Sequence, residues 1–262
     1  LLADPDINVV VIATRHDSHA RFVCQAIRAG NHVFVEKPLA VTYEELSEIE
    51  SVCTTSDAAN LLLMVGFNRR FSPLVQEIML LLNSVHEPKS FIFTINAGEL
   101  PKDHWQQDAA SGGRIVGEAC HFVDLMRYLA GCPITELQAV SMRNSGEADV
   151  SDDRVSFTLR FSDGSIGTVH YLANGHRTFP KERLEIFCGG RILQLDNFRK
   201  LTGYGWSGFR KRKLWRQDKG HHAAIGEFID AVRTGAPAPI PLEQLVEITR
   251  VTLDVARVAK AS

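Results

Sequence analysis

The sequence is short of features that would set it apart from ordinary globular proteins. Its five cysteines include no Cys-x-x-Cys pair and have no disulfide-framework spacing, so reduced thiols in the cytoplasm are the simplest account. A net charge of -2 predicts no electrostatic attraction to nucleic acid or to an anionic membrane surface. No apolar run approaches the ~20 residues that cross a bilayer. What is present is 262 residues, 45% of them hydrophobic, which is ample material for one or two cores.

The stretch His-Val-Phe-Val-Glu-Lys-Pro, residues 32–38, is the most informative in the chain. Its apolar run predicts a buried parallel strand, and Pro38 ends that strand because proline cannot donate to a sheet ladder. Glu36 and Lys37 then lie at the carboxyl end of a strand, where open α/β sheets bind their ligands. A lysine in that position can exchange a proton with a substrate. A solvated charged turn is the alternative interpretation.

The first 70 residues alternate strand and helix with short connections. Residues 8–14 and 61–65 predict two further apolar strands, and Thr42 opens a capping box ahead of a helical pattern. Strands joined by helices form a parallel sheet with right-handed crossovers. We therefore predict an α/β fold in which residues 1–70 form the second half of a doubly wound, Rossmann-type dinucleotide-binding domain.

From residue 71 onward the pattern changes to short strands in which polar and apolar residues alternate. The clearest is 154–161, which precedes a Ser-Asp-Gly-Ser turn typical of a hairpin. Two amphipathic helices are predicted at 222–233 and 242–259. Residues 71–262 are therefore expected to form an α+β domain for substrate binding and oligomerisation, with an open, mostly antiparallel sheet and helices on one face.

An open sheet leaves one face without a cover. Four apolar residues share one side of the strand at 154–161, namely Val155, Phe157, Leu159 and Phe161. An apolar face of this kind is normally buried against another subunit. We expect a homodimer that forms through this sheet.

A helix predicted over residues 114–130 carries Glu118, His121 and Asp124 at intervals of three residues, so that they line one side. Side chains of these types can hold a metal, but no other His or Cys has a matching spacing, and we expect no metal site. His121 could instead be a structural histidine beside the core. In a third interpretation it handles a proton, a task that suits imidazole near neutral pH.

Several motifs follow the predicted strands in a fixed order. They are Ala-Thr-x-x-x-x-His ending at His19, Glu-Lys-Pro, Gly-Phe-Asn-Arg-Arg-Phe from Gly66, then Trp105, Gly112-Gly113 and His-Phe-Val-Asp from His121. This ordered set resembles the Gfo/Idh/MocA family of oxidoreductases over most of the chain. The resemblance implies an enzyme that transfers a hydride between NAD or NADP and a hydroxyl or keto carbon of a sugar or sugar nucleotide.

The resemblance also implies roles for individual residues. Lys37 and His121 would share the handling of the substrate's hydroxyl proton as the catalytic pair. The side chains expected at the cofactor are Thr14, His16, His19, Glu36 and Lys37. Those expected at the substrate are Trp105, Glu118, Asp124 and Arg70, with Trp105 either a lid over the cleft or a packing residue.

The sequence departs from the family pattern in two places. No Gly-x-Gly-x-x-Gly turn is present, so the chain is interpreted as a piece of a longer protein without the phosphate-binding half of the cofactor domain. Gly117 stands four residues before His121, where many relatives have aspartate, so that either the backbone is adjusted locally or the acid is not needed. The surrounding sequence resembles a subgroup linked to polysaccharide biosynthesis. The competing hypothesis is a non-catalytic binding or regulatory scaffold of the same fold.

Overall fold

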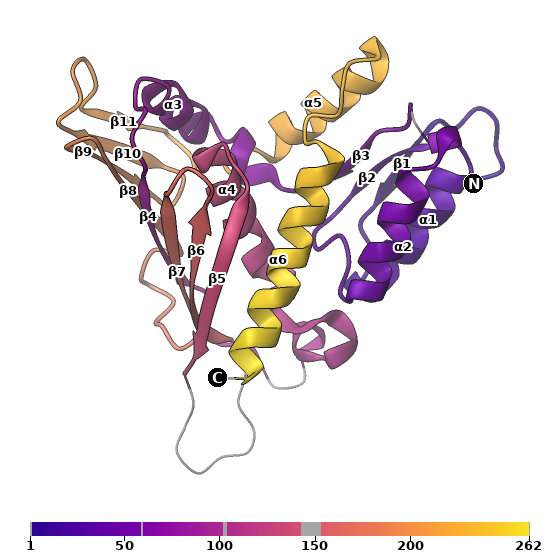
Figure 1. Ribbon diagram of the computed structural model, residues 1–262, viewed down its shortest axis with the longest axis horizontal. Coiled ribbons are helices and arrows are strands. Elements are labelled where there is room, and N and C mark those ends of the chain that lie inside the picture. Colours follow the sequence, from indigo (N-terminus) through magenta and orange to yellow (C-terminus); the bar gives the residue numbers. More distant parts are fainter. Residues whose placement is uncertain (1, 59, 102–103, 143–152, 262) are drawn as a thin grey trace. The chain divides into compact units, whose positions relative to one another are not determined.

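The computed structural model describes residues 2–58, 60–101, 104–142 and 153–261, and Figure 1 shows its helices and strands. The chain forms two compact units. The first unit comprises Leu1–Phe67, Asp103–Cys120 and His222–Leu253, and the second comprises Asn68–Lys102, His121–His221 and Asp254–Ser262. The domain division at residue 70 stays a prediction, and both units draw on segments beyond it.

The first unit is built on a three-stranded parallel sheet. Its strands are β1 (Val9–Ile12), β2 (His32–Val35) and β3 (Leu63–Val65), in the order β1-β2-β3. Helices α1 (His19–Arg28) and α2 (Tyr43–Cys53) make the two crossovers. The predicted Rossmann-type arrangement is confirmed.

Of these two helices, α2 begins at the predicted capping box, whereas α1 begins without a side-chain cap. The Thr42 hydroxyl accepts a hydrogen bond from the backbone N–H of Glu45 at 3.1 Å, and the Glu45 carboxylate accepts one from the Val41 N–H at 2.8 Å. This pair satisfies amides at the start of α2. Ser18, which precedes α1, makes no such cap and instead donates to the Arg15 carbonyl at 2.7 Å.

Parts of two later helices belong to the first unit. Helix α5 (His221–Thr234) contributes Phe228, whose ring lies 5.7 Å from that of Phe34 on β2. In helix α6 (Leu242–Ala261), the residues up to Leu253 belong to the first unit and the remaining residues belong to the second. Both helices agree with the predicted amphipathic segments.

The second unit holds an eight-stranded sheet in the order β11-β10-β9-β8-β4-β7-β6-β5. All neighbouring pairs are antiparallel except β4 with β7. The strands are β4 (Ser90–Asn96), β5 (Ile134–Ser141), β6 (Arg154–Phe161), β7 (Ile166–Leu172), β8 (Glu182–Cys188), β9 (Arg191–Asp196), β10 (Lys200–Tyr204) and β11 (Lys211–Lys213). Helices α3 (Pro73–Leu82) and α4 (Cys120–Ala130) complete the unit.

The apolar side of β6 is already covered within one chain. The side chains of Val155, Phe157, Leu159 and Phe161 are each at most 1% exposed. Helix α4 covers this side of the sheet, since its Phe122 ring lies 5.3 Å from the ring of Phe93 on β4. The prediction that these four residues form an uncovered face was therefore wrong, because a helix of the same chain buries them.

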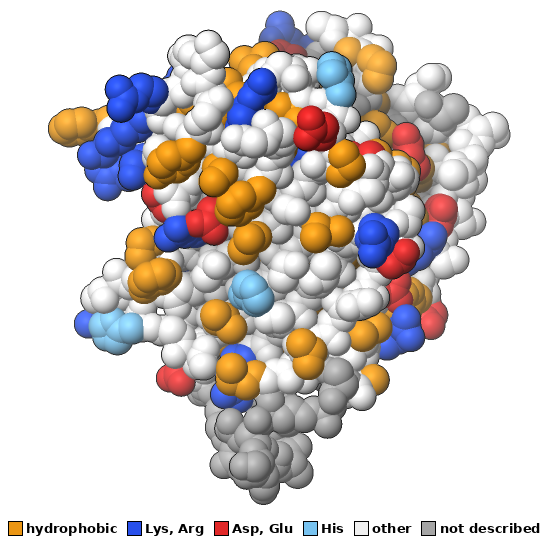
Figure 2. Space-filling view, turned by 60° about the vertical axis from the view of Figure 1, so that its left-hand side comes forward, with side chains coloured by type: hydrophobic (Ala, Val, Ile, Leu, Met, Phe, Trp, Pro, Cys, Tyr) orange, Lys and Arg blue, Asp and Glu red, His pale blue; other side chains and the backbone are white. Residues whose placement is uncertain are grey.

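The opposite side of the sheet is mixed in character. Ser156 pairs with His170 at 2.8 Å and Thr158 with Thr168 at 2.9 Å across β6 and β7. Exposed apolar side chains also occur on the strands, among them Val140, Ile166 and Phe187. Figure 2, in which the side of the molecule that carries this sheet comes forward, shows hydrophobic side chains scattered among polar ones.

Candidate active site

Three strand ends carry the predicted polar residues of the first unit. Thr14 follows β1 and is exposed, Glu36 and Lys37 follow β2 and are half-buried, and Gly66 follows β3. A Cβ added at Gly66 would lie 3.1 Å from Oε2 of Glu36, so the glycine leaves room for that carboxylate. Carboxyl ends of parallel strands meet at one edge, which is where ligands bind in such sheets.

Lys37 is fixed rather than solvated. Its Nζ donates a hydrogen bond of 2.8 Å to the carbonyl oxygen of Gly117, and the following peptide bond to Pro38 is cis. The half-buried ammonium and its main-chain partner do not fit the alternative of a freely solvated turn. The lysine points at a second segment of the same unit.

That segment is not the regular α-helix predicted over 114–130. Residues Ile115–Ala119 form a π-helical turn, and α4 begins only at Cys120. A π turn has i→i+5 hydrogen bonds and is wider than an α turn. Glu118 lies within it, so the α-helical phase shared by His121 and Asp124 does not extend back to Glu118. The backbone is thus adjusted locally at Gly117, and whether an acid is needed here stays open.

The imidazole of His16 occupies the space beside Gly117. A Cβ added at Gly117 would lie 2.8 Å from Cε1 and 3.3 Å from Nδ1 of His16. Because real Cβ atoms do not approach so closely, an aspartate would fit here only if His16 moved. His16 and Gly117 therefore fit each other sterically, because glycine at position 117 leaves the space that the His16 ring fills.

His16 is 5% exposed and held from two sides. Its Nδ1–H donates to the carbonyl of Ser111 at 3.1 Å, and the Trp105 ring meets it edge-on with centroids 4.8 Å apart. Burial lowers the pKa of His16 to about 4, the Ser111 carbonyl opposes that change, and the charge of Lys37 adds to it. The ring is thus neutral at pH 7 and packs against Trp105.

His19 is fully buried. Its Nδ1 lies 2.8 Å from the Pro38 carbonyl and its Nε2 lies 3.1 Å from the Thr14 carbonyl. Each ring nitrogen therefore lies next to a main-chain carbonyl oxygen, and the nitrogen that carries the proton donates to its neighbour. His19 therefore connects the segment after β1 to the segment after β2, and its contact with the cofactor stays a prediction.

In the second unit, His121 is the second residue of α4 and is 7% exposed. One turn later Asp124 is completely buried and pairs with Arg70, whose Nε donates to Oδ2 at 3.3 Å and whose Nη2 donates to Oδ1. Burial raises the pKa of Asp124, and the guanidinium opposes that rise. Arg70 and Asp124 form a buried ion pair that fixes the helix carrying His121, and the substrate contacts expected for these two residues stay a prediction.

A second buried ion pair escaped the sequence analysis. Arg69 donates to both carboxylate oxygens of Glu182 at 2.8 and 2.9 Å, and Lys219 also contacts that carboxylate. These cations lower the pKa of Glu182 to about 2 despite its burial. The Arg69 guanidinium lies 5.2 Å from the Phe122 ring, next to His121 in sequence. An acid on the inward side of an apolar strand was the signal that could have revealed the pair.

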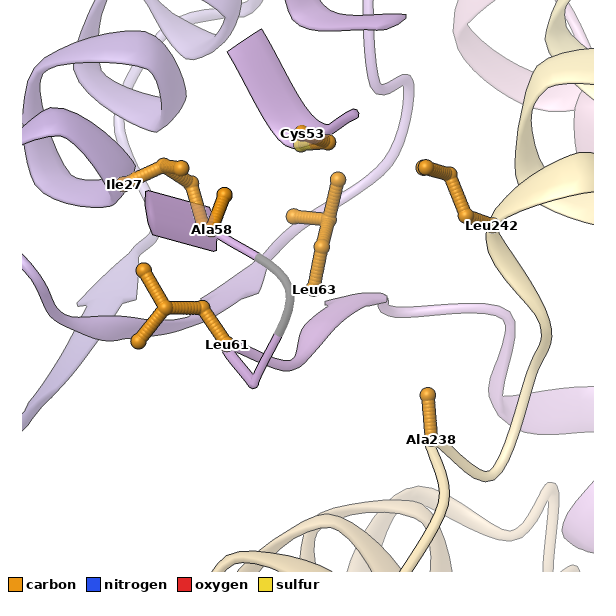
Figure 3. A pocket seen from close by; sticks show the side chains of 7 residues that line it. All are labelled: Ile27, Cys53, Ala58, Leu61, Leu63, Ala238 and Leu242. Carbon is orange, nitrogen blue, oxygen red and sulfur yellow. The ribbon is translucent and has the colours of Figure 1, made fainter. Parts of the chain in front are cut away.

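A small cavity of about 60 Å³ in the first unit is apolar. Figure 3 shows its lining side chains, which are Ile27, Cys53, Ala58, Leu61, Leu63, Ala238 and Leu242. Burial raises the pKa of the Cys53 thiol to about 12, so that it is not a reactive thiolate. The cavity contains no charged group that could orient a polar substrate.

No group of three or more His, Cys, Asp or Glu side chains among the described residues could hold a metal ion. No helix in the described ranges has the length and apolar character that a bilayer crossing requires.

Comparison with known proteins agrees with this geometry. Residues 1–67 match the model of an oxidoreductase family with an NAD-binding Rossmann fold, and residues 87–191 match the GFO/IDH/MocA C-terminal domain. The chain belongs to the Gfo/Idh/MocA oxidoreductase family. Both halves of the family fold are thus represented, in the order that the motifs predicted.

Among relatives of this Gfo/Idh/MocA chain is the uncharacterized oxidoreductase YrbE of Bacillus subtilis, 27% identical over 77% of this chain and 59% of its own length. The myo-inositol 2-dehydrogenase of Thermotoga maritima is 24% identical over 92% of this chain and 74% of its own. The chain therefore spans less than two thirds of the first of these proteins.

A solved structure of levoglucosan dehydrogenase in complex with NADH and levoglucosan superposes with a TM-score of 0.85 at 24% identity. It covers 99% of this chain and 80% of that chain. This similarity supports the fold of the Gfo/Idh/MocA chain.

Proposed function

We propose that the protein to which this chain belongs is an NAD(P)-dependent dehydrogenase that oxidises a hydroxyl carbon of a sugar, cyclitol or sugar nucleotide, or reduces the keto form. The observation that carries the proposal is the fixed ammonium of Lys37 at the carboxyl edge of the parallel sheet, donating to Gly117 at 2.8 Å. Relatives whose names specify myo-inositol and levoglucosan support the substrate class.

Lys37 and His121 would divide the proton handling between them. The π turn at Ile115–Ala119 runs directly into α4, so the two form one continuous helical segment. This segment carries the Gly117 carbonyl that accepts from Lys37, and it also carries the imidazole of His121. Lys37 would orient the substrate hydroxyl through its remaining N–H bonds. His121 would take the hydroxyl proton when the carbon is oxidised and return it in the reverse direction.

The cofactor would be held at the strand ends. Bound nicotinamide supplies hydride transfer, a chemistry that no side chain provides. Thr14 and Glu36 fit a polar ligand there, because the threonine is exposed after β1 and glycine at position 66 leaves the Glu36 carboxylate its space. Lys37 would lie between cofactor and substrate. Of the remaining predicted residues, Trp105 would border the substrate from beside the neutral His16, and Glu118 would face it from the π turn.

The test is a kinetic comparison in the full-length protein. Lys37→Ala and His121→Ala should each lower kcat by roughly a hundredfold or more, the usual scale of acid–base catalysis. The control variants His86→Ala and Lys211→Ala change exposed side chains of the same types. NADH formation is followed with myo-inositol, levoglucosan and sugar-nucleotide substrates. If His121→Ala folds and keeps normal turnover, His121 has only a structural role. If the unmodified protein is inactive on every substrate, the result favours the non-catalytic scaffold.

We also propose that a homodimer forms through the mixed face of the eight-stranded sheet. The exposed apolar side chains there include Val140, Ile166 and Phe187, at 57%, 40% and 40%. A monomer in light scattering at micromolar concentration would contradict it, and Phe187→Asp should weaken a dimer that uses this face. Residence in the cytoplasm and a role in polysaccharide biosynthesis remain predictions from the sequence.

A further inference from the structure

The second unit contains a wide, open surface cavity of about 610 Å³, whose lining includes neither Lys37 nor His121. Three segments form it: the connection from β7 to β8, the turn between β9 and β10, and the edge strand β11. Its charged lining residues are Arg177, Lys181, Arg199, Lys200, Lys213 and Asp196. Five cations and one acid therefore surround the cavity, although the whole chain carries a net charge of -2.

The single acid does not neutralise this cluster. Asp196 Oδ2 lies 3.8 Å from Lys200 Nζ, which is a loose pair on one side of the cavity. Lys200 is also the direct cross-strand partner of Lys213 in the ladder between β10 and β11. Like charges placed opposite each other in a sheet are destabilising. A bound anion would relieve that repulsion.

The backbone around the cavity is held in place by groups outside the cation cluster. Asn96 donates through Nδ2 to the carbonyls of His176 and Phe179 at 2.9 and 3.2 Å, which fixes the connection from β7 to β8. Phe198 has a φ of 52° and is 1% exposed, so its buried ring anchors the turn between β9 and β10. Preorganised walls reduce the entropy that a ligand must overcome.

The rest of the lining suits an organic ligand better than a bare ion. Phe179 lines the cavity and is 57% exposed, which offers an aromatic face to a sugar or a base. Inorganic phosphate alone would fill only part of the volume.

We propose that this cavity binds the phosphate or diphosphate group of an organic ligand, such as a nucleoside diphosphate or its sugar ester. Arginine and lysine side chains bind phosphate through charge-assisted hydrogen bonds, and a cationic pocket concentrates anions. Neither Lys37 nor His121 lines the cavity, so its existence does not depend on the proposed hydride transfer. If the ligand is the substrate of that reaction, the cavity determines which sugars are accepted.

Calorimetry of the protein with saturating NADH tests the site, because the cofactor blocks its own pyrophosphate site. The probes are uridine diphosphate, pyrophosphate, inorganic phosphate and a short single-stranded oligothymidylate. We expect uridine diphosphate to bind about tenfold or more tightly than inorganic phosphate, since each added charge-assisted bond contributes on that scale. Phe179→Ala should weaken uridine diphosphate and leave pyrophosphate unchanged.

The decisive variant is Lys200→Gln with Lys213→Gln, which should weaken both diphosphate probes by about tenfold or more. Its matched control is Arg210→Gln with Lys211→Gln, which removes two exposed cations from the same basic segment outside the cavity. Because the first pair removes opposed like charges, its thermal midpoint should not fall, so lost binding cannot be ascribed to unfolding. Equal weakening by both variants, tighter binding of the oligothymidylate, or no diphosphate binding would each overturn the proposal.

Discussion

Replacing Gly117 by alanine tests the match between this residue and His16. In an unhindered helix, alanine is more stable than glycine by about 1 kcal/mol. Here the new Cβ would lie 2.8 Å from Cε1 of a buried imidazole that Trp105 and Ser111 hold in place. Overpacking of a filled interior costs about 1–3 kcal/mol. We expect Gly117→Ala to be neutral or destabilising, by up to about 2 kcal/mol.

The contribution of His16 is isolated by a double-mutant cycle. In a His16→Ala background the obstructing ring is gone, so the same Gly117→Ala change should become stabilising by about 1 kcal/mol. Urea denaturation followed by tryptophan fluorescence measures all four proteins, and Trp105 beside His16 makes the signal sensitive to this region. Equal stabilisation by Gly117→Ala in both backgrounds would refute the reasoning, because it would mean that His16 does not occupy the space.

Three further predictions concern buried ionisable groups. The pKa of His16 is lowered from 6.5 to about 4, so between these pH values the unfolded chain binds a proton that the folded chain does not. The free energy of unfolding therefore falls as pH drops from 6.5 to 4, and urea denaturation of His16→Asn should show a shallower pH dependence in that range. The pKa of Glu182 is lowered from 4.5 to about 2, so its contribution is complete above 4.5 and lost as pH falls toward 2, and Glu182→Gln should flatten acid denaturation in that window. Arg70→Ala should cost about 3–5 kcal/mol in urea denaturation by leaving Asp124 buried without its cation, whereas Arg70→Ala with Asp124→Leu should recover much of that loss.

The sheets were predictable because burial imposes a period on the sequence. The continuous apolar runs of β2 and β3 indicate strands covered on both faces, and strict alternation in β6 indicates a strand with one face in the core. The run of β1 is equally apolar, yet Val11 on that strand is 65% exposed. The error about β6 arose at the next level. Alternation shows which side is apolar, and only tertiary structure shows that α4 covers it.

The details of the site were harder to predict, since they depend on one-residue shifts and on distant pairs. The π turn at Ile115–Ala119 has the same apolar spacing as the α-helix that follows, so nothing in the sequence separates them. Arg70 and Asp124 are 54 residues apart, and Arg69 and Glu182 are 113 apart. Motifs correctly brought Lys37 to a strand end, whereas the partner of each buried charge required the folded chain.

The imidazole of His19 acts as a spacer of fixed length between two loops. It contacts the carbonyl of Thr14 on one side and that of Pro38 on the other, at 3.1 and 2.8 Å. An insertion or deletion in either loop would pull one carbonyl out of reach and leave a buried nitrogen without its partner. The segment that offers Thr14 and the segment that presents Lys37 must therefore keep their lengths together, and loop grafting between relatives would have to exchange both at once.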